Sequence, residues 1–151
     1  MPSDSTVFGD TNVFLYAQDP RAPEKRDACA AWIAWCWKAQ RGRLSSQVLH
    51  ELYANLRRVA PTLDKQVARD VVRRYRAWSA WLVDDAGVEL AWQLQDRFVL
   101  GYWDALMVAA ALHQGCTYLL TEDLQHEQQI DRVQVLSPFL VGPDVLEATP
   151  R

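Results

Sequence analysis

The sequence has few of the residues on which several common kinds of site depend. Its three cysteines, Cys29, Cys36 and Cys116, show neither a CxxC redox motif nor a zinc-binding spacing. Their odd number and wide separation indicate reduced thiols that fill the core, so we expect a cytoplasmic protein. Only 6 glycines occur in 151 residues, and neither the dinucleotide-binding nor the P-loop glycine motif is present. These absences argue against a zinc finger and against the glycine-dependent nucleotide-binding folds.

Histidine pairs and long apolar runs are also lacking. His50, His113 and His126 show no HxxxH or HxH spacing, which argues against a zinc hydrolase and against a metal-free ribonuclease that depends on histidine. The longest apolar run, residues 105–112, is too short to span a bilayer. Residues 1–6 lack the basic and apolar regions of a secretory signal. We therefore expect no association with a membrane.

Charged residues occur at an ordinary frequency, but they are unevenly distributed along the chain. Half of the residues are apolar and 23% are charged, which is typical of one globular domain. The net charge of −3 argues weakly against a nucleic-acid partner. Residues 57–76, however, contain seven basic and two acidic residues. Within them Arg69, Arg73 and Arg76 share one face of a helix, which is either a solvated surface or a surface that contacts phosphates.

The spacing of apolar residues predicts alternating strands and helices. We expect strands at residues 6–9, 43–45, 117–121 and 133–136. We expect helices at residues 11–17, 24–39, 47–59, 64–82, 88–98 and 104–114. This alternation implies a parallel sheet that is covered by helices on both faces. We expect residues 1–139 to form a single domain and residues 140–151 to form a loose C-terminal tail.

Some helical positions can be predicted individually. In the helix at 64–82, the residues expected to face the core are Val67, Val71, Tyr75 and Trp78. Gly115 is expected to end the helix at 104–114 as its C-cap. Most of the seven tryptophans lie on apolar helical stripes, so we expect them in the core or at a subunit interface. Trp35 and Trp37 lie off the main stripe of their helix and are expected to face a partner chain.

Four acidic residues stand beside predicted core elements. Asp10 and Asp123 follow two of the strands, Asp104 precedes an apolar helix, and Glu51 lies within an apolar helical pattern. Ligands of parallel sheets bind beyond the carboxyl ends of the strands, so Asp10 and Asp123 should point into one crevice. Carboxylates are seldom buried unless they are paired or bind a metal. The set therefore predicts a site for hard divalent cations, which prefer oxygen ligands.

Each acid also has a purely structural interpretation. Asp10 and Asp104 could be N-caps of the helices that follow them, because aspartate is common at that position. Asp123 could cap a turn that runs to His126. Glu51 could be a solvated residue at the margin of its helix.

The acids nevertheless occur in an ordered set of short motifs. The first is Asp10-Thr11-Asn12 followed by apolar residues, and the second is Ser46-Gln47-Val48-Leu49-His50-Glu51-Leu52 with Asn55 one turn later. The third is Tyr102-Trp103-Asp104-Ala105-Leu106, and the fourth is Leu120-Thr121-Glu122-Asp123. A closing VxVxxPF pattern spans residues 133–139. Over residues 7–139 the sequence resembles the PIN-domain ribonucleases, in particular the VapC-type toxins of bacterial toxin–antitoxin pairs.

The resemblance implies a three-layer α/β/α domain with a short parallel β-sheet and an endoribonuclease that requires Mg²⁺ or Mn²⁺. The implied catalytic and metal-binding residues are Asp10, Glu51, Asp104 and Asp123. The implied supporting residues are Thr11, Asn12, Asn55, Thr121 and Glu122. The residues expected to hold the RNA backbone are Arg57, Arg58, Arg69, Arg73 and Arg76. The resemblance further implies a homodimer and a cognate antitoxin as a partner protein.

Three questions stay open in the sequence. Glu122 is next to Asp123, and although the motif favours Asp123, either carboxylate could face the metal. One metal ion or two would satisfy the same acids. A PIN-like domain can also serve as a catalytically inert RNA- or protein-binding module after losing acids, although all four acids are present here.

Overall fold

The computed structural model describes residues 5–147, and its centre is a five-stranded sheet. The strands are β1 (Val7–Gly9), β2 (Gly42–Arg43), β3 (Tyr118–Leu120), β4 (Gln129–Ile130) and β5 (Val133–Leu136). Their order is β2-β1-β3-β5-β4, and all neighbours are parallel except β4 and β5. Gly9 pairs with Leu120, so the carboxyl ends of β1 and β3 lie side by side.

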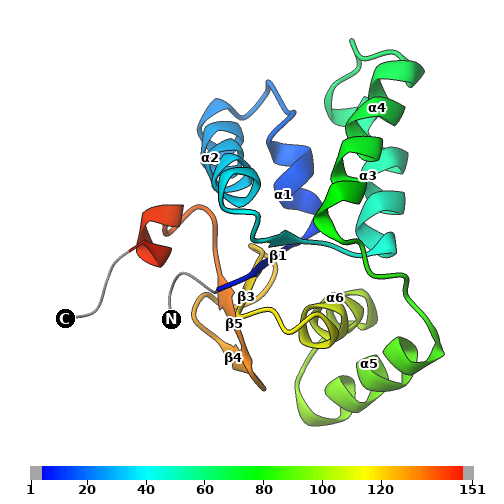
Figure 1. Cartoon of the computed structure of the whole chain (residues 1–151), viewed down its shortest axis with the longest axis vertical. Coiled ribbons are helices and arrows are strands. Elements are labelled where there is room, and N and C mark those ends of the chain that lie inside the picture. Colours follow the sequence, from blue (N-terminus) through cyan, green and yellow to red (C-terminus); the bar gives the residue numbers. More distant parts are fainter. Residues whose placement is uncertain (1–4, 148–151) are drawn as a thin grey trace.

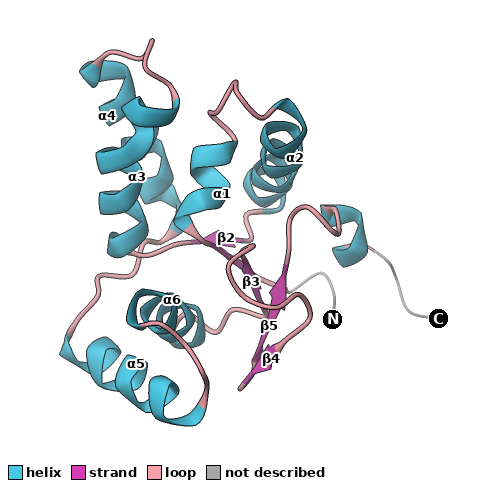
Figure 2. Cartoon of the chain, turned by 180° about the vertical axis from the view of Figure 1, so that it is seen from behind, coloured by secondary structure: helices cyan, strands magenta, loops and turns pink. Residues whose placement is uncertain are grey.

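The helices cover the sheet on both faces. They are α1 (Thr11–Tyr16), α2 (Pro23–Ala39), α3 (Ser46–Val59), α4 (Lys65–Tyr75), α5 (Asp85–Arg97) and α6 (Tyr102–His113). Figures 1 and 2 show α1 and α2 on one side of the sheet and α5 and α6 on the other. The helices α3 and α4 form a hairpin beside α1. The predicted three-layer α/β/α arrangement is therefore confirmed.

The most apolar segments occupy the centre of these layers. Every residue of α6 from Ala105 to Leu112 is buried, since α6 packs between the sheet and α5. A helix that is apolar on all sides is stable only in such a position. In the strands, Phe8, Leu119 and Val135 are almost fully buried. Each such side chain contributes roughly 1.5–3 kcal/mol through removal of apolar surface from water, so this core fixes the ends of β1 and β3.

The turn between β1 and α1 is fixed by close aromatic packing. The ring centroid of Phe14 lies 4.8 Å from that of Tyr75 and 5.4 Å from that of Trp78. The same ring passes so close to Gly9 that an added Cβ would lie 2.7 Å from Phe14 Cζ. Glycine is therefore required at the residue that precedes Asp10, and the cluster sets the position of Asp10.

The predicted helix at 64–82 begins where expected, with Asp64 as the N-cap of α4, but its predicted C-terminal end is wrong. The α-helix ends at Tyr75, a 3₁₀ turn follows at Arg76–Trp78, and Ser79 adopts a left-handed φ of 53°. Val67 is 42% exposed because it lies in the first turn of α4, at the end of the hairpin that points away from the sheet. The other three residues predicted to face inward, Val71, Tyr75 and Trp78, are buried.

The end of the described chain is packed rather than loose. Val141 O accepts a hydrogen bond of 2.9 Å from Trp32 Nε1 in α2. Leu146 is buried within the 3₁₀ turn at Pro143–Leu146. Trp35 Nε1 donates to Glu147 Oε1 at 3.1 Å, so the chain itself covers part of Trp35. Residues 148–151 of the expected tail lie outside the described residues.

Several smaller predictions can also be compared with the structure. Gly115 has a φ of 67° directly after α6, which confirms it as the residue that ends this helix. The three cysteines are free and buried. Trp37 is 40% exposed, and its expected contact with a partner chain stays a prediction. Strand β4 was not predicted, because two residues are too few to show an alternating pattern. None of the helices within residues 5–147 is long and apolar enough to cross a membrane.

Candidate active site

Asp10 and Asp123 lie beyond the carboxyl ends of the adjacent strands β1 and β3. Asp10 N donates to Leu120 O at 3.1 Å, which continues the hydrogen bonding between the strands by one residue. Thr121 Oγ1 donates to Asp10 Oδ2 at 2.7 Å and accepts from Asp123 N at 3.1 Å. One threonine hydroxyl thus links the carboxylate of Asp10 to the backbone of Asp123, and both acids lie at the same edge of the sheet.

Asp10 is held in an unfavourable electrostatic environment. Its side chain is buried, and burial raises its pKa to about 7. The hydrogen bond from Thr121 lowers this pKa, whereas the nearby carboxyl groups of Asp123 and Asp104 raise it. Asp10 occupies the N-cap position of α1 but makes no side-chain capping bond. The capping interpretation therefore does not account for the buried carboxylate.

Asp104 approaches the other acids from α6. The helix begins at Tyr102 with Gly101 as its N-cap, so Asp104 lies inside the first turn and the interpretation of Asp104 as an N-cap is wrong. Burial raises the pKa of Asp104, and the charges of Asp123 and Glu51 raise it further. Asp104 therefore lies near both Asp123, which follows β3, and Glu51 of α3.

Glu51 completes the group from α3, where it is half-buried. Thr11 Oγ1 donates to Glu51 Oε1 at 2.8 Å, so the first residue of α1 orients this carboxylate. Asn55 Nδ2 donates to the carbonyl oxygen of Glu51 at 2.8 Å. Asn55 therefore contacts the backbone of α3 rather than the carboxylate, and its predicted supporting role is an indirect one.

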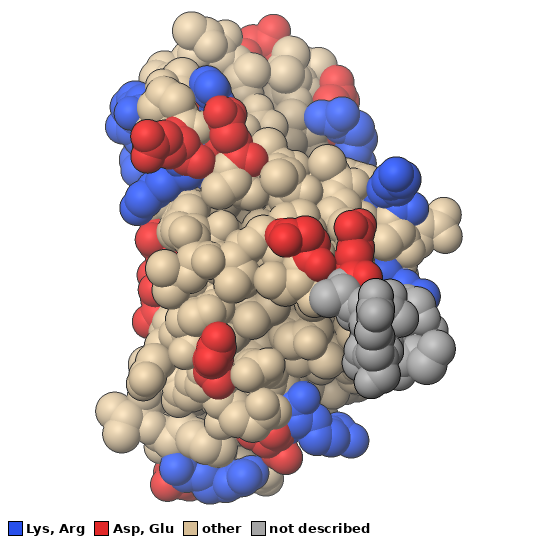
Figure 3. Space-filling view, turned by 90° about the vertical axis from the view of Figure 1, so that its left-hand side faces the viewer, with Lys and Arg blue, Asp and Glu red and all other residues tan. Residues whose placement is uncertain are grey.

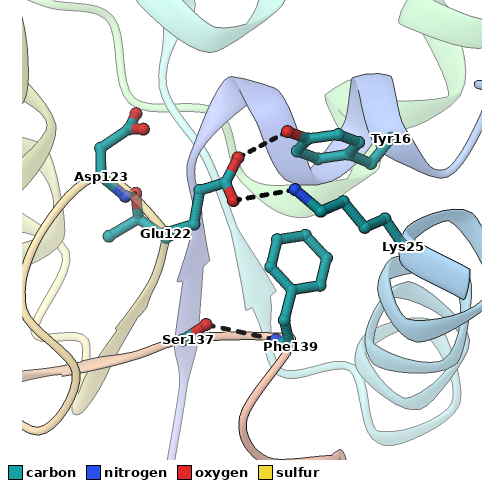
Figure 4. A network of polar contacts seen from close by, with 7 residues as sticks. Tyr16, Lys25, Glu122, Asp123, Ser137 and Phe139 are labelled. Carbon is teal, nitrogen blue, oxygen red and sulfur yellow. Dashed lines mark hydrogen bonds and ion pairs between the residues drawn. The ribbon is translucent and has the colours of Figure 1, made fainter. Parts of the chain in front are cut away.

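Glu122 points away from the other acids. It accepts hydrogen bonds from Tyr16 Oη at 2.6 Å and from Lys25 Nζ at 3.5 Å. Figure 4 shows the side chain of Glu122 extending toward Tyr16 and Lys25, whereas that of Asp123 diverges from it. Of the two neighbouring acids, Asp123 is the one whose charge acts on Asp10 and Asp104.

The sequence did not single out Tyr16 or Lys25. Tyr16 belongs to the first motif, but nothing in the sequence distinguishes its hydroxyl from that of a core tyrosine. Lys25 lies near the start of α2 and has no signal at all, because it reaches Glu122 only through folding. Hydrogen bonding to Glu122 raises the pKa of Tyr16, so the phenol stays protonated and donates.

The remaining polar candidates line two hollows. Asn12 and Arg58 border a cavity of about 190 Å³ beside α1, together with Tyr16. The three arginines of the predicted stripe, Arg69, Arg73 and Arg76, line a groove of about 550 Å³ with residues of α3. Both hollows are therefore bordered by helices that also carry residues of the acidic group.

Arg57 and two members of the stripe are already engaged, since Arg69 Nε also donates to Tyr53 Oη at 3.3 Å. Arg57 Nε donates to the carbonyl oxygen of Leu63 at 3.0 Å. Arg73 Nη1 pairs with Asp70 Oδ1 at 2.7 Å. Binding of an RNA phosphate by Arg73 would therefore compete with an existing ion pair.

The donor chemistry of the acidic group suits a hard cation. Within residues 5–147, no lysine or arginine forms an ion pair with any of the four acids. In the same part of the chain, no three histidine, cysteine or acidic side chains stand close enough to hold a metal ion as they are placed. The four carboxylates are thus neighbours with uncompensated charge rather than a closed set of ligands. Carboxylate oxygens are the ligands that Mg²⁺ and Mn²⁺ prefer.

Comparison with known proteins identifies the family. The model of the PIN domain matches residues 7–132. The chain belongs to the PIN domain family. Membership of this family supports nuclease activity in general terms, without specifying the metal or the nucleic acid. No curated protein is significantly similar to this PIN domain in sequence.

Solved structures agree with this assignment at the level of the fold. A DNA-bound VapBC from Salmonella typhimurium is 16% identical with a TM-score of 0.60, over 89% of this chain and 98% of that chain. VapBC2 from Rickettsia felis, bound to a DNA fragment from its promoter, is 15% identical with a TM-score of 0.57. That similarity covers 87% of this chain and 98% of the other. Because both identities are low, the likeness shows the PIN fold alone.

Proposed function

We propose that this PIN domain is an endoribonuclease that requires Mg²⁺ or Mn²⁺ and hydrolyses RNA phosphodiester bonds. The observation that supports the proposal most is the convergence of Asp10, Glu51, Asp104 and Asp123 from four different elements. Burial and mutual repulsion raise the pKa values of Asp10 and Asp104. Such an arrangement destabilises a fold unless a cation offsets it, which is a reason to assign the group to chemistry.

Each acid has a distinct part in this proposal. Asp10 and Asp104 are the primary metal ligands and Asp123 completes the site. Glu51 positions the attacking water, directly or through a metal-bound water. A divalent ion held there would make a bound water more acidic and offset the negative charge that develops on the phosphate.

Two threonines orient these carboxylates. Thr121 fixes Asp10 and Thr11 fixes Glu51 through hydrogen bonds of 2.7 Å and 2.8 Å. Each bond engages one oxygen of the carboxylate and limits its rotation. The opposite oxygen of each acid is left for a metal ion or a water molecule, which is how residues around a metal site commonly orient its ligands.

The proposal includes a partner protein and a second copy of the chain. The fold is that of proteins solved as VapBC complexes, so we propose that this PIN domain is the toxin of a toxin–antitoxin pair and that it forms a homodimer.

The basic groove of α3 and α4 is the proposed contact for the RNA backbone. Figure 3 shows that the face on the α2 side carries acidic and basic groups in small clusters, so that face offers no continuous basic surface.

The test is cleavage of a mixed pool of structured RNA by purified protein with Mn²⁺ or Mg²⁺. Asp104→Asn and added EDTA should each abolish cleavage, with a loss of at least about 100-fold, because an oxygen ligand or the metal is removed. Asp96→Asn is the matched control, since Asp96 is an exposed aspartate on α5. Cleavage that survives Asp104→Asn would contradict the assignment of the site. Absence of both cleavage and metal binding in calorimetry would favour the alternative, an inert RNA- or protein-binding module.

A further inference from the structure

Glu122 joins its loop to two consecutive helices, α1 and α2, that are far from it in the sequence. Its carboxylate accepts from Tyr16 Oη of α1 at 2.6 Å and from Lys25 Nζ of α2 at 3.5 Å. Lys25 Nζ also lies 4.9 Å from the ring centroids of both Tyr16 and Phe139. The rings of Tyr16 and Phe139 meet edge to face at 5.4 Å. We call these four residues the Glu122 clamp (Figure 4).

Asp123, the next residue, lacks a comparable anchor, because its side-chain hydrogen-bonding partner is another acid, Asp10. Within residues 5–147, no N–H group and no serine, threonine or tyrosine hydroxyl donates to its carboxylate. Its carboxylate faces Asp10 and Asp104, which share its charge. The repulsion tends to turn an exposed side chain outward, so the direction of Asp123 depends on the backbone that carries it.

That backbone is fixed from two sides. On one side, Asp123 N donates to Thr121 Oγ1 at 3.1 Å. On the other, Glu122 is tied to Tyr16, which lies in the helix that directly follows Asp10. The clamp therefore connects the loop of Asp123 to the helix of Asp10, and it fixes one acid relative to the other.

The ion pair between Lys25 and Glu122 alone would not fix the loop of Asp123. Exposed pairs such as Lys25 and Glu122, with side chains 46% and 28% exposed, contribute about 0–1 kcal/mol. The hydrogen bond from Tyr16 is shorter and charge-assisted, which makes it about twice as strong as a neutral one. Its geometry is fixed further by the contact between the rings of Tyr16 and Phe139.

We propose that Glu122 is a positioning residue, whose clamp with Tyr16 and Lys25 directs Asp123 toward Asp10 so that the two carboxylates can bind one divalent cation. This inference rests on the proposed function, because it assumes that the acids bind metal. It assigns the two adjacent acids of the loop to different tasks: Asp123 contacts the metal, and Glu122 holds the loop.

The test is the affinity for Mn²⁺, measured by calorimetry on the intact protein without RNA. Tyr16→Phe removes the hydroxyl and keeps the ring, whereas Glu122→Gln removes the charge that holds Lys25. Residues that orient ligands typically change metal affinity by about 10-fold or more, so we expect each variant to weaken Mn²⁺ binding about 10-fold. The double variant should be weaker by less than the product of the two, because both changes act on the same contact.

Glu127→Gln is the matched control, since Glu127 lies in the same loop, has a side chain that is 69% exposed and loses the same charge. It should bind Mn²⁺ as the unchanged protein does. Variants with a lower melting temperature but unchanged Mn²⁺ affinity would overturn the clamp and leave the proposed function intact. If the unchanged protein binds no Mn²⁺, the metal site itself fails, and the role of the clamp fails with it.

Discussion

At the scale of single residues, Asp10 combines a precise position with an unfavourable charge. Its carboxylate is buried and bonded to Thr121, yet its pKa is raised to about 7. The dominant cause is burial, which disfavours the charged form, and the neighbouring acids add to it. A purely structural role does not account for a buried carboxylate held in this way, which agrees with the proposed role of Asp10 as a metal ligand.

Asp10→Asn should stabilise the fold in a pH-dependent way. Because the pKa of Asp10 is raised on folding, its contribution to stability is complete below the unfolded value near 3.8 and is lost as pH rises toward 7. Each pKa unit corresponds to about 1.4 kcal/mol. We expect the variant to exceed the unchanged protein by a few kcal/mol at pH 8 and by much less at pH 4.

Urea unfolding in EDTA at the two pH values measures this difference. Asparagine can still accept the hydrogen bond from Thr121, so the contact itself is preserved. An equal effect of Asp10→Asn at pH 4 and pH 8 would show that the carboxyl group is not the source of the strain.

At the scale of elements, the junction of β1 and α1 determines where the site forms. Gly9 ends β1, Asp10 follows, and Phe14 of α1 folds back over Gly9. The ring of Phe14 is held in turn by Tyr75 and Trp78. The aromatic cluster on one side of the sheet therefore supports the acid at its edge.

Gly9→Ala should destabilise the protein by about 1–3 kcal/mol, the usual cost of forcing extra volume into a packed core. The added Cβ would lie 2.7 Å from Phe14 Cζ, and the neighbouring rings leave Phe14 little room to move. Chemical denaturation of Gly9→Ala, Phe14→Leu and the double variant measures the coupling. The double variant should be more stable than the sum of the single effects predicts, and strict additivity would contradict the clash.

At the scale of the whole molecule, charge is divided between the acidic site and the hairpin of α3 and α4. The net charge is −3, while residues 57–76 carry seven basic and two acidic residues. Arg69 and Arg76 line the same groove as Arg73. Under the proposed function, this groove is the candidate contact for the phosphates of RNA.

Replacing Arg69, Arg73 and Arg76 together by glutamine should weaken RNA binding and reduce its dependence on salt. The slope of log affinity against log salt should fall by up to about 2, since each lost phosphate contact on a single strand contributes about 0.7. Fluorescence anisotropy in an Asp104→Asn background separates binding from cleavage. A matched triple of exposed residues on other elements, Lys38, Arg97 and Arg132 to glutamine, should change the slope less. Equal effects of the two triples would indicate that only net charge matters.

The sequence predicted features that depend on local pattern. The strand before Asp10 and the apolar helix containing Asp104 are recognisable because their burial imposes a pattern on adjacent residues. Val67 was placed wrongly, since whether a helical face is covered at a given turn depends on where its partner helix ends. The packing of residues 140–147 on α2 was missed for the same reason: the contact with Trp32 joins positions 109 residues apart.

By itself, the sequence determined the order of the main helices and strands and marked Asp10, Glu51, Asp104 and Asp123 as the candidate acids beside or within them, because these are properties of short segments. Only the tertiary structure decided that Glu122 turns to Tyr16 and Lys25 while Asp123 turns to Asp10. It alone decided that Asp10 is buried enough to have a pKa of about 7. Both outcomes depend on distances between charges and on exclusion of water, and these exist only when segments far apart in the chain have packed together.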